Sequence, residues 1–144
     1  MQVKLENRTV TLDIQADLAL SDDTLDNDMC ALAQKIGMYA ELMGEAYTYS
    51  LNLKHDTEVT EANADQYIRA LAKTSGDKIT EPAIKQQVSL ASEVRAARRA
   101  YYAADGQHRT VEGVYRALRD KGNLAIALCY KQKEEIRVMN SPIG

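Results

Sequence analysis

Arginine and tyrosine side chains recur along the C-terminal half of the chain at spacings that place them on one side of a helix. Arginine neutralises phosphate groups, and a tyrosine ring offers a flat face on which an unpaired base stacks, worth roughly 1–3 kcal/mol per base. Phosphate contacts carry no sequence information, so such a surface would bind single-stranded nucleic acid with little base preference. The candidate nucleic-acid-binding residues are Arg95, Arg98, Arg99, Tyr101, Tyr102, Arg109, Arg116, Arg119 and Lys121.

The same residues also fit a plainer interpretation, an ordinary solvated helix face. Glu112 and Arg116 are four residues apart with the acid first, the order that favours an ion pair on a helix, and Lys131 and Glu135 have the reverse order. Residue types alone do not decide between a binding surface and such a face.

No stretch of the sequence carries a catalytic signature. The serine elbow G-x-S-x-G, the Walker A loop, the zinc motif H-E-x-x-H and the dinucleotide fingerprint do not occur. Cys30, His55, His108 and Cys129 lack the short paired spacings of a zinc site. We therefore expect no catalytic residue, no cofactor and no metal, with both cysteines buried as thiols in a reducing cytosol and His108 in a core.

The element that would position the arginines is a long helix over residues 80–138. Thr80-Glu81-Pro82 is typical of a helix start. About 57 residues would extend roughly 85 Å, which no single globule of 144 residues could bury, so we expect self-assembly. Alternating steps of three and four define its heptad seam: Val94, Ala97, Tyr101, Ala104, His108, Val111, Tyr115, Leu118, Gly122, Ala125 and Cys129.

One dipeptide inside this helix, Asp105-Gly106, is a common turn signal and could instead divide it into a hairpin. The seam keeps its phase from Tyr101 to His108, and a turn would normally lose that phase. We therefore expect the helix to continue.

A second heptad seam predicts a helix in the N-terminal half. Ser21-Asp22-Asp23 is typical of its start, and the seam ends near Lys54-His55. Gly37 and Gly44, seven residues apart, suggest a line of close helix approach. The seam residues are Leu25, Met29, Leu32, Ile36, Tyr39, Met43, Ala46, Ser50 and Leu53.

Two segments lie outside the seams. Apolar residues alternate over 2–14 around Asn7-Arg8, which predicts a short strand or hairpin that must pack on a helix or another subunit. Residues 56–79 break the heptad pattern and are expected to be an insertion with a short helix over 62–73, ended by Ser75-Gly76-Asp77.

Charge divides the chain in two. Residues 1–80 hold 7 Lys and Arg against 14 Asp and Glu, a net charge of −7, whereas residues 81–144 hold 11 against 7, a net charge of +4. The basic half can face a polyanion, and the acidic half suggests a protein contact or a shield. The N-terminus lacks an apolar leader and no apolar run approaches the ~20 residues of a membrane span, so we expect a cytoplasmic protein with no membrane partner.

Together these patterns predict a mainly α fold: a long antiparallel helical hairpin with heptad seams, a short extra helix in the connection and a short N-terminal β segment, assembled as an oligomer. We expect an N-terminal strand-like segment over 1–20, a helical domain over 21–138 and a frayed tail over 139–144.

The order of motifs over roughly residues 20–135 resembles the small phage recombination-mediator family, the UvsY-like proteins. The likeness rests on the acidic helix with its tyrosine-containing seam and on three stretches further along. These are T-E-P-A-I-K-x-x-V at Thr80 to Val88, E-V-x-x-A-R-R-x-Y at Glu93 to Tyr101, and A-L-R-D-K-G-N-L-A-I-A-L at Ala117 to Leu128.

This resemblance implies a non-enzymatic protein that forms ring-like or barrel-like homo-oligomers and binds single-stranded DNA. Such proteins help a RecA-type recombinase to replace single-strand-binding protein, here in the host cytoplasm if the chain is phage-encoded. The family's DNA contact involves a basic pair just before Tyr-Tyr; Arg98-Arg99 before Tyr101-Tyr102 is the nearest match, offset by one residue. The alternative is a helical scaffold or assembly chaperone whose arginines pair with the acids of another protein.

Overall fold

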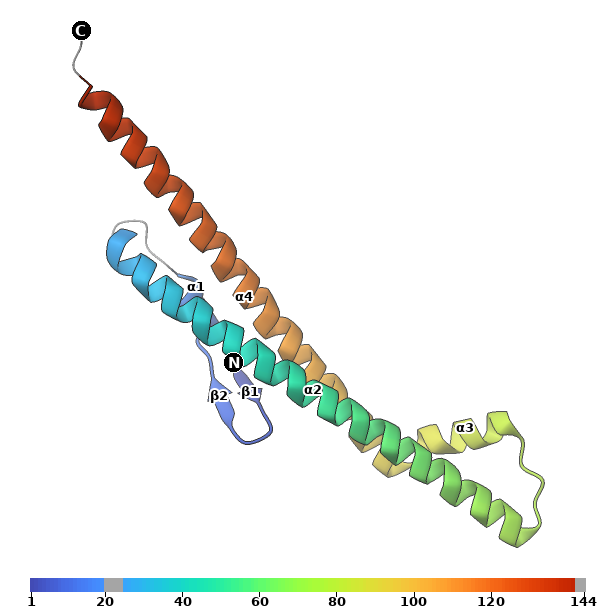
Figure 1. Cartoon of the computed structure of the whole chain (residues 1–144). Helices are drawn as coiled ribbons and strands as arrows, with labels where there is room; N and C mark the ends of the chain where they lie inside the picture. Colours follow the sequence, from blue (N-terminus) through green and yellow to red (C-terminus); the bar gives the residue numbers. More distant parts are fainter. Residues whose placement is uncertain (20–24, 142–144) are drawn as a thin grey trace. The chain divides into compact units, whose positions relative to one another are not determined.

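The protein is mainly helical, with two long helices that pack against each other and a small two-stranded sheet (Figure 1). The computed structural model describes residues 1–19 and 25–141, except the side chains of 25–28. The helix start expected at Ser21-Asp22-Asp23 lies outside the described residues. In chain order the elements are β1 (Gln2–Lys4), β2 (Thr9–Thr11), α1 (Ile14–Leu18), α2 (Leu25–Ser75), α3 (Glu81–Leu90) and α4 (Ser92–Met139).

The chain divides into two compact units. Unit one comprises residues 1–2, 11–43 and 110–144, and unit two comprises residues 3–10 and 44–109. Each unit contains a segment of α2 and a segment of α4.

In unit one the segments of α2 and α4 run antiparallel. Met29 of α2 lies beside Cys129 of α4, with 3.7 Å between the two sulfur atoms. Further along α2, a Cβ atom built on Gly122 would lie 3.3 Å from Cδ1 of Ile36. Residue numbers rise along one helix as they fall along the other, which confirms the predicted antiparallel pairing within this unit.

The close approach between helices in unit one occurs at Gly122. Gly37 and Gly44, which the sequence suggested for this role, have no heavy atom within 4 Å of a built Cβ. That prediction is wrong because both glycines lie on the exposed side of α2.

In unit two the pairing is again antiparallel. The rings of Tyr47 on α2 and His108 on α4 have centroids 5.2 Å apart, and Glu61 further along α2 accepts a hydrogen bond from Arg98 of α4. The heptad seam of α4 continues here as predicted, because Val94 and Ala104 are buried.

The expected break of the N-terminal helix after Lys54-His55 is wrong, because α2 continues to Ser75. Thr57 occupies the seam position where the apolar pattern fails, yet it is buried. Its hydroxyl donates to the carbonyl oxygen of Leu53 at 2.8 Å, and Ser50 likewise donates to Tyr47 at 2.8 Å. A small side chain whose hydroxyl bonds the preceding turn can therefore lie in the seam without an unpaired polar atom.

The single helix expected over residues 80–138 is also wrong, because it is interrupted at Ala91. There the backbone is extended, with φ −59° and ψ 133°, between α3 and α4. No glycine or proline marks this position. The break accompanies a buried cluster of Ile84, Val88 and Val94 that packs against Ala64 of α2.

The N-terminal alternation forms the predicted hairpin. β1 pairs with β2, and the N–H of Leu5 donates to the carbonyl oxygen of Arg8 at 2.8 Å across the turn. The alternation ends earlier than expected, because Ile14 begins α1. The Asp13 side chain caps that helix by accepting from the N–H of Ala16 at 3.1 Å.

Two glycines give a matched prediction for stability. Gly106 lies inside α4, which confirms helix continuity at Asp105-Gly106, and a Cβ there meets nothing within 4 Å. Gly106→Ala is expected to stabilise the protein by about 0.5–1 kcal/mol, because alanine loses less backbone entropy in a helix.

Gly76 follows the last residue of α2 and has a φ of +74°, so Gly76→Ala should destabilise the protein by about 1–2 kcal/mol. Urea unfolding measures both; shifts of the same sign would contradict these conformations.

Candidate nucleic-acid interface

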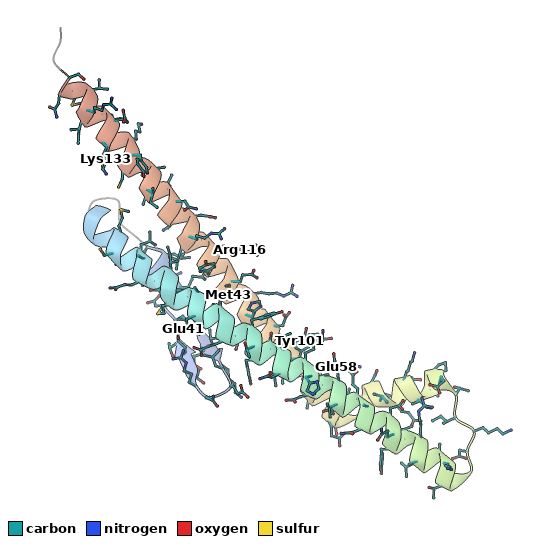
Figure 2. The ribbon with its side chains drawn as sticks, viewed as in Figure 1. Glu41, Met43, Glu58, Tyr101, Arg116 and Lys133 are labelled. Atoms are coloured by element: carbon teal, nitrogen blue, oxygen red, sulfur yellow. The ribbon has the colours of Figure 1, made fainter. Side chains whose placement is uncertain are left out.

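The segment of α4 in unit two places six candidate residues along roughly four turns of helix. Arg95 and Arg99 are exposed, and their guanidinium groups form no hydrogen bond or ion pair with the described part of the chain. The rings of Tyr101 and Tyr102 lie 5.4 Å apart at 41°, and Tyr102 is 65% exposed. Free guanidinium groups therefore share α4 with the exposed ring of Tyr102 and with half-buried Tyr101, which Figure 2 labels.

Arg98 has a different role from its neighbours. Its Nε donates to Oε1 of Glu61 at 2.7 Å, and both side chains are about two-thirds buried. This bond links α4 to α2, so Arg98 is less available to a phosphate than Arg95 or Arg99. The sequence could not show this pairing, because 37 residues separate the two partners.

Arg109 is paired within its own helix. Its Nε donates to Oδ2 of Asp105 at 2.9 Å, while its side chain remains 75% exposed. Exposed ion pairs of this spacing contribute only about 0.3–0.5 kcal/mol. A phosphate can therefore replace Asp105 as the partner of Arg109 at little cost.

The N-terminal hairpin covers one flank of unit two. The backbone N–H of Lys4 donates to Oε1 of Gln107 at 3.0 Å. Arg8 donates to both carboxylate oxygens of Glu45, at 3.2 and 2.5 Å, and Asn52 donates to the hairpin turn at 3.3 Å. Glu45 and Glu61 are 16 residues apart, about 160° round α2, so the hairpin occupies the flank of the helix pair opposite Arg98 and Glu61.

Unit one holds the other three candidates, and they differ among themselves. Arg116, labelled in Figure 2, donates to Oε1 of Glu112 at 2.6 Å, which confirms the ion pair expected from sequence. Arg119 is exposed and has no ion-pair partner among residues 1–19 and 25–141. Lys121 donates to the carbonyl oxygen of Leu18, so it fixes the end of α1 rather than extending the arginine stripe.

Helix α1 is fixed in unit one by a second set of contacts. The hydroxyl of Tyr39 donates to Oδ2 of Asp17 at 2.7 Å, and Lys35 lies 3.3 Å from the other carboxylate oxygen. Burial, together with the bond to Asp17, raises the pKa of Tyr39 well above its usual value. This tyrosine therefore serves packing and is not available to a ligand.

Two expectations about isolated residues need correction. Cys30 is exposed rather than buried, and Cys129 is half-buried; both are free thiols. His108 is half-buried at the seam, where its ring contacts Tyr47.

Tyr47 was not among the candidates chosen from the sequence, because it lies beside the heptad seam of α2 rather than in it. The signal that could have found it is the antiparallel register, which places it opposite His108.

Within residues 1–19 and 25–141 the protein shows neither a metal site nor a membrane-spanning helix. No group of three or more His, Cys, Asp or Glu side chains there could hold a metal ion. No helix in the same ranges is both long enough and apolar enough to cross a membrane.

Comparison with protein-family models, with curated proteins and with solved structures finds no match to this chain.

Proposed function

We propose that the protein is a non-enzymatic, single-stranded-DNA-binding recombination mediator of the UvsY-like kind. The observation that carries this proposal is the surface of unit two, where the unpaired guanidinium groups of Arg95 and Arg99 share α4 with exposed Tyr102, whose ring contacts half-buried Tyr101. Such a surface offers charge to phosphates and ring faces to bases. The order of sequence motifs that resembles the mediator family supports the same assignment.

In this proposal the chain assembles into a homo-oligomer in the cytoplasm and holds DNA that single-strand-binding protein has covered. It then assists a RecA-type recombinase in loading onto that DNA. Several weak sites on one oligomer raise the effective concentration, so avidity can exceed the affinity of one site by about 10²–10⁴. Weak individual contacts allow the strand to pass to the recombinase, because each site can release it separately.

Titration of a fluorescently labelled oligonucleotide at about 50 mM and about 200 mM salt tests the proposal, with light scattering to give the mass of the assembly. We expect binding that weakens steeply with salt, because displaced counterions set the dependence. We also expect a mass greater than one subunit. Absence of binding at the lower salt concentration would exclude DNA as the ligand.

A helical scaffold or assembly chaperone is the second candidate, and one observation favours it. Leu124, Ile126, Leu128 and Tyr130 on α4 in unit one are each 41–67% exposed, and a helix that is apolar on several sides usually contacts other protein. Capture of a defined protein partner, together with no affinity for DNA, would favour this function.

A further inference from the structure

We propose that Tyr47, supported by His108, is a second stacking platform for an unpaired base of single-stranded DNA. The inference deepens the proposed function and rests on it. It adds to the binding surface a residue on α2, whereas every candidate chosen from the sequence lies on α4.

The ring of Tyr47 packs against the ring of His108. The centroids of Tyr47 and His108 are 5.2 Å apart with the ring planes tilted by 46°, within the range of favourable aromatic contacts. Tyr47 remains 50% exposed although it touches His108, which is half-buried. The histidine therefore holds the tyrosine ring in place while part of that ring stays accessible to a ligand.

The N-terminal hairpin leaves this ring uncovered. Tyr47 and Glu61 are 14 residues apart, so they lie on the same line of α2, and Glu61 is bonded to Arg98 of α4. The hairpin contacts Glu45, which is only two residues from Tyr47 but about 200° round the helix. Tyr47 thus lies on the flank where α4 presents its arginines.

The charges near the ring favour a nucleic acid strand as its occupant over an apolar peptide. His108 is followed by Arg109, a 75% exposed cation, and it comes seven residues after Tyr101. Seven residues span about 10.5 Å of helix, or about three nucleotides at 3.4 Å each. One strand can therefore place bases on both aromatic groups of unit two and a phosphate near Arg109.

The experiment compares three variants of the full chain with the wild type: Tyr47→Ala, Tyr47→Phe and Tyr67→Ala. Tyr67 is the matched control, because it lies on α2 in unit two and is 66% exposed, but it has no aromatic contact within the described ranges. Each protein is titrated with a labelled oligothymidine and with a strand of the same length whose central residues are abasic. Circular dichroism reports helix content in every case.

We expect Tyr47→Ala to weaken binding of the intact strand about 5- to 150-fold, the loss of one stacked base, without a change in salt slope. Tyr47→Phe, which keeps the ring, and Tyr67→Ala should bind as the wild type does. On the abasic strand the penalty of Tyr47→Ala should vanish.

Unchanged binding by Tyr47→Ala, or an equal penalty on both strands, would overturn the platform while leaving the proposed function intact. A wild-type protein that binds neither strand would overturn both.

Discussion

Replacing Leu118 with Asp is expected to unfold unit one. The Leu118 side chain is fully buried in the seam of α4, one turn before the close approach at Gly122. Removing a buried leucine side chain costs about 2–5 kcal/mol, and an unpaired buried carboxylate adds several more. The sum is comparable to the total stability of a typical domain, about 5–15 kcal/mol. Circular dichroism should show a large loss of helix and of cooperative melting.

The matched control is Leu124→Asp, six residues further along the same helix. Leu124 is 62% exposed, so a carboxylate there stays hydrated and the fold of the subunit should survive. If both variants melt like the wild type, the seam does not hold unit one together. If both unfold, the exposed end of α4 is itself buried in an assembly.

The second large effect is expected on the affinity for single-stranded DNA when Arg95 and Arg99 are replaced. The double variant Arg95→Ala, Arg99→Ala should bind single-stranded DNA about 10²- to 10⁴-fold more weakly, because two bonds to charged groups, at about 1.5–3 kcal/mol each, are lost. The slope of log K against log salt should become shallower by about 1.4, the value for two phosphates on a single strand. Helix content and assembly mass should not change, because neither side chain has a partner in the described structure.

Arg98→Ala provides the contrast within the same turn. Its bond to Glu61 crosses from α4 to α2, so its loss should lower the melting temperature and change the salt slope little. If the slope of log K against log salt changes in Arg98→Ala and not in the Arg95 and Arg99 variant, then Arg95 and Arg99 are not the residues that bind phosphates. Fluorescence anisotropy at several salt concentrations separates these outcomes.

Heptad periodicity predicted that two long helical segments pair in antiparallel fashion and predicted the seam of α4, but it did not predict where the helices end. The pattern survives Asp105-Gly106 because the seam residues on either side, Ala104 and Val111, are both buried. A local turn signal is thus overridden where tertiary packing holds the helix on both sides.

Periodicity failed where long-range contacts or backbone bonding decide the structure. The hydroxyl of Thr57 bonds its own helix, so a polar seam residue did not mark an end of α2. The interruption at Ala91 accompanies the packing of Ile84, Val88 and Val94 against Ala64 of α2, and no glycine or proline marks it. Likewise, residue type could not show that Arg98 is bonded to Glu61 and Lys121 to Leu18.

The bond between Lys4 of β1 and Gln107 of α4 joins residues 103 positions apart. On a ribosome adding about 5–20 residues per second, roughly 5–20 s separate the synthesis of these two residues. A two-stranded hairpin is marginally stable by itself in water. The two strands are therefore expected to form a stable hairpin only after the helices on which they pack have been synthesised. The earliest strand of this chain to be translated is therefore among the last parts to reach its native place.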